Sequence, residues 1–222
     1  MCRSGHAPRD RSGFSTLWLI LTLPIFLTLF AFVFEMGHMW VARVELENGL
    51  ESAALAAVRS WAESGSSDTY LPRQVGAAYA ANNTVRSYPL VLGLNHDPAA
   101  GPDNPNQNLT CTATVYSPVG AVSPEGNLIF GAILTDDPNC PLTFNAGIRP
   151  SCGQSYVEIG GSGGTEYAVR AQAVMEVPSP ICRLFGLAMP AYRITAFTIA
   201  AYSCAERRPR LVRVDQYICP GP

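Results

Sequence analysis

Apolar residues form one uninterrupted stretch near the start of the chain. Residues 14–34 read FSTLWLILTLPIFLTLFAFVF and contain no charged side chain. As a helix this stretch would be about 30 Å long, which matches the hydrocarbon core of a bilayer. Pro24 lies inside the stretch, and membrane helices tolerate such a proline. The pattern therefore predicts a transmembrane helix over residues 14–34.

After Phe34 the pattern becomes amphipathic, with no turn signal in between. Apolar residues recur at spacings of three and four, interrupted by Glu47, and this is the period of a helix with one apolar face. The segment Ser64-Gly65-Ser66-Ser67-Asp68 then breaks the pattern. We expect one helix that continues from the membrane to about Glu63, with an apolar stripe formed by Met36, Trp40, Val44, Leu50, Ala54, Val58 and Trp61.

The rest of the chain alternates between short strand patterns and turn-rich segments. Alternating, β-branched segments predict strands at 109–116, 127–134 (with Gly131 as a bulge candidate), 156–159, 167–177, 192–203 and 211–218. Short helices are expected at 71–85 and 181–187, and a loop at 87–108. The predicted class is α+β, with a long N-terminal helix followed by a β-rich domain.

The charges beside the apolar stretch predict its orientation. Arg3, Arg9 and Arg11 precede it, and the basic flank of a span faces the cytoplasm. We therefore expect four regions, which are a cytoplasmic tail (1–13), a transmembrane helix (14–34), an amphipathic extension of that helix (35–64) and an extracytoplasmic domain (65–222).

A cleaved secretory signal is the alternative interpretation. Its apolar core would be about 7–15 residues long and would be followed closely by a small-x-small cleavage site. The apolar stretch here is longer, and the first Ala-x-Ala, at Ala54-Leu55-Ala56, lies far downstream. The pattern favours an uncleaved anchor.

The cysteines support the same orientation. Cys2 precedes the apolar stretch and the other six of the seven cysteines follow it. An even set on one side of a membrane suggests an oxidising compartment and up to three disulfides, whereas the alternative is six buried thiols. Cys140 and Cys152 are close in sequence and would close a short loop, so we predict that these two form a local disulfide. The disulfide candidates are Cys111, Cys140, Cys152, Cys182, Cys204 and Cys219.

Little in the composition indicates catalysis. The net charge of −2 provides no basic surface for nucleic acid, and all 15 basic residues are Arg, which excludes Schiff-base lysines and Gly-Lys phosphate loops. His96 would be the one histidine available to a hydrolase in the outer domain, but beside Pro98 it is typical of a turn. Asp136-Asp137 before Pro138 is likewise typical of a turn rather than of a calcium site. We predict no enzyme activity, no metal, no cofactor, no small-molecule substrate and no nucleic-acid partner.

Two stretches of the chain carry a recognisable pattern. In the first, Arg11-x-Gly13 precedes the apolar helix, which contains Leu23-Pro24. This is followed by an acidic residue before glycine (Glu35 to Gly37), an Arg-containing segment, Glu47-Asn48 and an Ala-rich run. In the second, residues 167–201 look like paired strands around a Leu-Phe-Gly-Leu turn. Together the two stretches resemble the TadE/TadG-like proteins of the tight-adherence (Flp-type) pilus and secretion system, and the resemblance implies a pilin-like globular domain after the helix.

The resemblance also implies a single-pass inner-membrane protein with other pilus-assembly or pilin-like subunits as partners, beside the bilayer. Glu35 and Arg43 are then candidates for contacts at the membrane border. Glu35 would either pair with a basic group of a neighbouring subunit or lie among the lipid headgroups, and we favour the headgroups. Pilin-like signals are cleaved after Gly and carry Glu at the fifth mature position. Gly13 before Phe14 matches the first feature, but Trp18 stands at the fifth position, so we expect an intact anchor. Many larger TadG-like chains carry an Asp-x-Ser-x-Ser metal motif, which is absent here.

The leading hypothesis is a membrane-anchored structural or assembly component, similar to a minor pilin, of a Tad/Flp-type pilus or envelope secretion machine. It would act through helix packing and protein–protein contacts. One alternative is a membrane-tethered extracytoplasmic module that binds a ligand or partner unrelated to pili. A tethered hydrolase that uses His96 is a weaker alternative.

Overall fold

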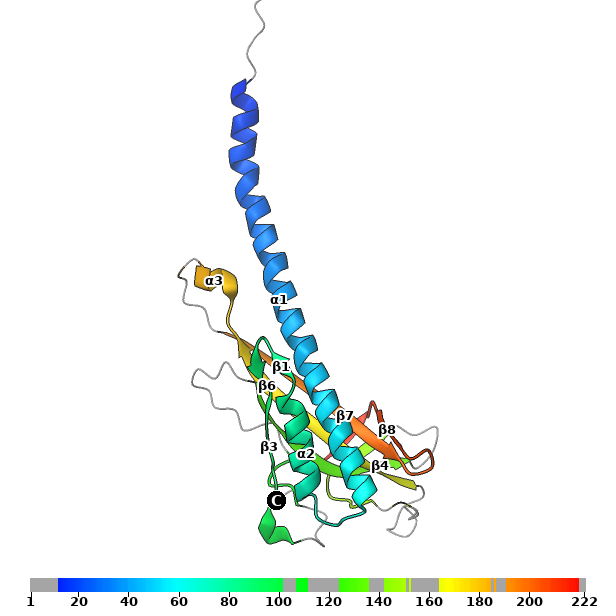
Figure 1. Ribbon diagram of the computed structural model, residues 1–222. Helices are drawn as coiled ribbons and strands as arrows, with labels where there is room; N and C mark the ends of the chain where they lie inside the picture. The colour runs from blue at the N-terminus through cyan, green and yellow to red at the C-terminus, as the bar shows by residue number, and fades with distance from the viewer. Residues whose placement is uncertain are drawn as a thin grey trace, which may run out of the picture.

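The computed structural model describes residues 12–101, 107–111, 124–135, 142–150, 152, 164–184, 186 and 191–219. Within them, one long helix, α1 (Ser12–Ser64), leads into a sheet-rich domain (Figure 1). The predicted α+β class and long N-terminal helix are confirmed. The predicted strand at 156–159, most of the one at 109–116, Cys140 and Asp136-Asp137 lie outside the described residues.

Helix α1 is continuous through the apolar stretch and the amphipathic extension. It passes through Pro24, whose carbonyl accepts a hydrogen bond of 2.8 Å from the Thr28 hydroxyl. It ends close to the predicted position, where Gly65 has a φ of +58° and donates its N–H to the Trp61 carbonyl at 3.2 Å. A left-handed residue of this kind is a common helix stop.

Three long antiparallel strands form the centre of the sheet. They are β4 (Glu125–Thr135), β6 (Gly164–Val177) and β7 (Tyr192–Ser203), and they confirm the strands predicted at 127–134, 167–177 and 192–203. Among the described residues the sheet has seven strands in the order β8-β7-β6-β4-β5-β9, and β3 (Val91–Gly93) lies parallel to β4. Gly131 is not a bulge, because its pairing with Ala168 continues the ladder without a break.

The short elements differ from the predicted ones. Helix α2 (Tyr70–Ala81) ends before the predicted Val85, which belongs to a strand, β1 (Thr84–Val85). Arg86 and Ser87, with φ values of 52° and 71°, form a tight turn between β1 and β2 (Tyr88–Pro89). The expected loop 87–108 thus contains β2, β3 and the 3₁₀ turn η1 (Pro98–Ala100). Helix α3 (Pro180–Leu184) occupies the expected helical turn.

The single last strand predicted at 211–218 is wrong. The structure has two strands, β8 (Arg208–Leu211) beside β7 and β9 (Gln216–Ile218) beside β5 (Thr143–Asn145), at opposite edges of the sheet. In a flat sheet these edges would be five strand spacings apart, about 24 Å. Five extended residues reach at most about 18 Å. The sheet therefore curls, and we call residues 212–219 the C-terminal strap.

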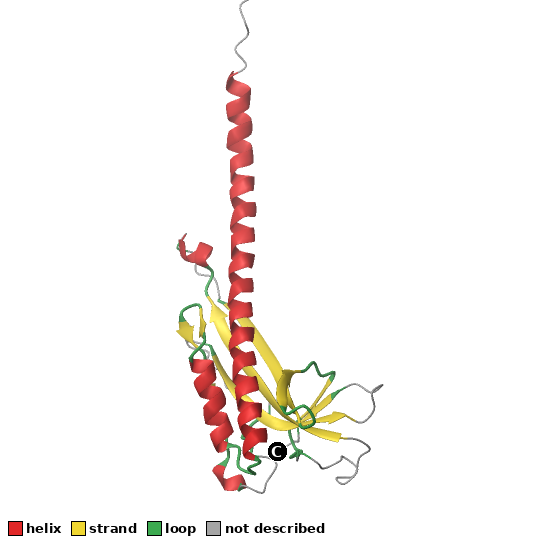
Figure 2. Cartoon of the chain, turned by 45° about the vertical axis from the view of Figure 1, so that its right-hand side comes forward, coloured by secondary structure: helices red, strands yellow, loops and turns green. Residues whose placement is uncertain are grey.

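The alternating residues of the strands build a core on each face of the sheet. On one face the lower half of α1 covers β6 and β7, and helix α2 lies beside α1 and contacts β3 (Figure 2). On the other face a smaller cluster forms around Ile129, Ile133 and Phe144, with Val212, Val214 and Tyr217 of the strap packed against it. Trp61 of α1 lies at the centre of the first core, with its ring 5.1 Å from that of Phe130 and 4.8 Å from that of Tyr167.

The buried face of α1 only partly follows the predicted stripe. Met36, Trp40 and Val44 are exposed, with Trp40 at 69%. The structure buries an alanine-rich face instead, because alanine lets the helix approach the sheet closely. Its fully or almost fully buried members are Ala42, Leu46, Leu50, Ala53, Ala54, Ala57, Val58 and Trp61.

One disulfide is present among the described residues. It joins Cys152 to Cys204, whose Cα atoms are 5.5 Å apart. The local pairing hypothesis of Cys140 with Cys152 is therefore wrong. The partner of Cys152 lies 52 residues away, in the turn just after β7, so the tertiary fold and not local spacing selects it.

Arg73 is a fully buried cation at the junction of α2, β4 and the loop that follows β3. Its guanidinium donates hydrogen bonds to the carbonyls of Leu94, Asn95 and Leu128 at 2.8–3.0 Å. It also contacts the Thr69 hydroxyl, the Asn108 amide oxygen and the Phe130 ring. Burial lowers the pKa of Arg73 to about 9, although the charge of Asp68 opposes this shift.

We predict that Arg73→Met lowers the free energy of unfolding by about 3–5 kcal/mol, because it leaves buried carbonyls without donors. Denaturant titration of the full chain in detergent micelles measures this loss. Arg59→Met is the matched control, since the Arg59–Glu63 pair is exposed and its removal should cost less than about 0.5 kcal/mol. Equal losses in the two variants would contradict the organising role of Arg73.

A second prediction concerns the contact between α1 and α2. A Cβ atom at Gly76 would lie 2.9 Å from the Ala57 Cβ and 2.8 Å from Leu128 Cδ1. Gly76→Ala should therefore cost about 1–3 kcal/mol through overpacking. Gly37→Ala, also inside a helix but with nothing within 4 Å of the added atom, should be neutral or slightly stabilising in the same titration.

Candidate functional site

The upper half of α1 carries an apolar surface that the domain does not cover. Its large apolar side chains from Leu17 to Phe34 are more than half exposed. The segment is apolar enough to cross a membrane by length and composition, and none of its most hydrophobic window is buried in the protein. Since water would strongly disfavour such a surface, this part of α1 fits a single membrane crossing.

Glu35 lies directly below this apolar segment. It is only 9% exposed, and within the described part of the chain neither of its carboxylate oxygens has a hydrogen-bond partner. His38, one turn further on, also has a buried Nε2 atom without a partner there, and its ring stacks on that of Phe34. Buried carboxylates are normally hydrogen-bonded or paired, so this is the most unusual electrostatic feature of the described helix.

Three charged groups, two on α1 and one in the β1–β2 turn, surround His38. Burial, followed by the positive charge of Arg86 in the β1–β2 turn, lowers the pKa of His38. The carboxylates of Glu35 and Glu45 oppose this shift. Glu45 also accepts a 2.7 Å hydrogen bond from the Arg86 backbone N–H, which attaches the β1–β2 turn to α1.

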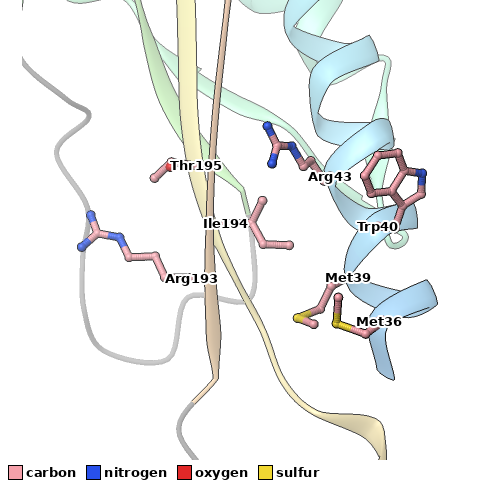
Figure 3. Close-up of a pocket in the computed structure, with 7 residues that line it drawn as sticks. All are labelled: Met36, Met39, Trp40, Arg43, Arg193, Ile194 and Thr195. Atoms are coloured by element: carbon pink, nitrogen blue, oxygen red, sulfur yellow. The ribbon is translucent and has the colours of Figure 1, made fainter. Parts of the chain in front are cut away.

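A groove of about 310 Å³ lies between this part of α1 and the start of β7. Met36, Met39, Trp40 and Arg43 line it from the helix, and Arg193, Ile194 and Thr195 line it from the strand. Figure 3 shows Ile194 pointing toward the helix, whereas Arg193 lies on the other side of the strand. The Arg43 guanidinium is 2.8 Å from Glu47 Oε1, an exposed pair of a kind that contributes little stability.

Other residues singled out in the sequence do not join this site. His96 lies 3.2 Å from Asp68 Oδ1 with its ring against Tyr70, so it attaches the loop to the start of α2. No serine or cysteine side chain of the described chain hydrogen-bonds to it. The described residues also contain no group of three His, Cys, Asp or Glu that could hold a metal. A second cavity of about 360 Å³ borders β3 and β4 and includes Asn127.

The comparison with protein families concerns this helix. Residues 13–60 match the family model described as "Putative Flp pilus-assembly TadE/G-like". The chain carries a TadE/G-like segment. The match confirms the resemblance found in the N-terminal sequence, and it covers α1 almost to its end, including Glu35 and Arg43.

The globular domain lies outside the matched residues, so the resemblance of residues 167–201 stays a prediction. A search of curated proteins and a search of solved structures gave no match.

The sequence singled out Glu35 and Arg43, but it did not indicate that the Glu35 side chain is buried. We expected its carboxylate to lie among lipid headgroups, and the structure buries it instead. The β7 side of the groove was also missed, because it comes from a segment more than 150 residues further along the chain. Met36 and Trp40, which line the groove, are the residues from which the sequence could have indicated it. Because they follow the helical period, we assigned them to the buried face of the helix instead.

Proposed function

We propose that this protein is a membrane-anchored assembly component, similar to a minor pilin, of a Tad/Flp-type pilus or envelope secretion machine. One observation carries the proposal: the residues that match the TadE/G-like family model form one continuous helix. This helix is apolar before Glu35, and after Glu35 it contributes to the core of the domain. Such a helix presents both its membrane segment and its border to neighbouring subunits. The anchor stays uncleaved, so Gly13–Phe14 is not processed.

Glu35 supports a specific contact at the membrane border. A buried carboxylate without a partner in the described chain is costly, and a basic group of a neighbouring subunit would remove that cost. Arg43 lies two turns below it, beside the groove, and its exposed pair with Glu47 leaves it accessible to a partner. Both residues are thus assembly contacts in this proposal.

Replacement of Glu35 tests this contact. Glu35→Gln should lower the number of surface pili by about tenfold or more, because a charge-assisted hydrogen bond is lost. The membrane level of the protein should remain unchanged. Glu63→Gln is the matched control on the same helix, since Glu63 is exposed and its ion pair among the described residues is with Arg59. Normal piliation of the Glu35→Gln strain would overturn the assigned contact.

Deletion of the gene tests the assembly role itself, with surface pili and adherence as readouts. We expect both to be lost and to return on complementation. Normal piliation of the deletion strain would favour a tethered binding module unrelated to pili, for which the cavity beside β3 and β4 would be the candidate site.

The proposed orientation has its own test. The excess of arginine before the apolar stretch supports a cytoplasmic N-terminus in the inner membrane, with the domain outside the cytoplasm. A protease added to spheroplasts should degrade the domain and leave a tag at the N-terminus protected. Digestion of the tag with retention of the domain would contradict this orientation.

A further inference from the structure

The C-terminal strap brings two cysteines together that are 108 positions apart in the sequence. Cys219 follows β9 directly, and Cys111 packs against the cluster on the back of the sheet. The Tyr217 hydroxyl donates a 2.6 Å hydrogen bond to the Cys111 carbonyl, which holds the two segments side by side. The Cys219 side chain lies within hydrogen-bonding reach of the Cys111 thiol.

Several contacts fix the strap at this point. Strand β9 is parallel to β5, and Ala146 N–H donates to the Ile218 carbonyl at 3.0 Å. The Tyr217 ring stacks on Phe144 and lies under the Arg170 guanidinium, 4.1 Å from its central carbon. The closeness of Cys111 and Cys219 is therefore built into the sheet and does not depend on a chance approach of two side chains.

We propose that Cys111 and Cys219 form a second disulfide, which locks the C-terminal strap across the back of the sheet. The Cys152–Cys204 bond in the same domain supports an oxidising compartment, where neighbouring thiols become oxidised. The bond would close a loop that contains every strand from β4 to β9. Cys182 on α3 has no part in it.

The chemistry is thiol–disulfide exchange with an oxidised dithiol oxidoreductase. The Cys219 thiolate attacks the disulfide of the oxidant and forms a mixed disulfide, while the first thiolate of the oxidant leaves. The Cys111 thiol then loses its proton and its sulfur attacks Cys219, which releases the second thiolate. Two electrons and two protons pass to the oxidant. Burial, followed by the hydrogen bond to Cys219, raises the pKa of Cys111, which makes the Cys111 thiol a poor first nucleophile.

Peptide mapping without reduction tests the bond. The full chain is purified from membranes in detergent after alkylation, then cleaved after Arg and Glu. We expect peptide 87–125, which contains Cys111, to be linked to peptide 214–222, which contains Cys219. Peptide 126–158 linked to peptide 194–206 is the internal control for Cys152–Cys204. Recovery of alkylated 87–125 and 214–222 as separate peptides, or of either linked elsewhere, would overturn the proposal.

A thermal test gives an independent readout. Closing a loop of about 100 residues constrains the unfolded chain, so Cys111→Ser, Cys219→Ser and the double variant should each lower the melting temperature by about the same 10 °C. Cys182→Ser is the matched control and should leave the melting temperature unchanged. Small shifts that add in the double variant would indicate two packed thiols and would contradict the bond.

Discussion

The packing of the alanine-rich face of α1 on the sheet is the contact on which the rest of the molecule depends. Its small, fully buried alanines let the helix approach its neighbours closely, as at Ala57, which lies against Gly76 of α2, and Trp61 packs edge-on against Tyr167 of β6. The same helix continues without a break into the exposed apolar segment. Anchor and domain are thus joined through a helix that is part of the core and not through a flexible linker. A tilt or rotation of the membrane segment would pass directly to the domain.

Buried polar contacts and the curl of the sheet complete this framework. Arg73 of α2 binds backbone carbonyls of two other segments, the loop after β3 and strand β4, and this is possible because a guanidinium presents five donors in one plane. On the other face, the strap crosses between the two edges of the sheet and covers the second core. The helix, Arg73 and the strap therefore stabilise different parts of the same sheet.

Below the apolar segment, α1 carries two features that a stable fold alone does not require. Glu35 is buried without a partner in the described chain, and the neighbouring groove exposes Met36 and Trp40. A protein that only needed to fold would not gain from this arrangement, because both features cost free energy in the isolated chain. Both costs would be relieved by the same event, which is the approach of another subunit or lipid to this side of α1.

The sequence by itself determined the elements whose signal is local. An uncharged apolar stretch of this length, a helical period without turn residues and three long alternating segments led to α1, β4, β6 and β7, because neighbours in sequence decide those patterns. Only the tertiary structure decided that Met36, Trp40 and Val44 are exposed while Ala42 and Leu46 are buried, since alanine and methionine give ambiguous signals until a sheet lies against one side. The same holds for Arg73, which looks like any surface arginine in sequence. It holds also for the Cys152–Cys204 pair and for the split of the last strand, because long-range pairing depends on the curl of the whole sheet.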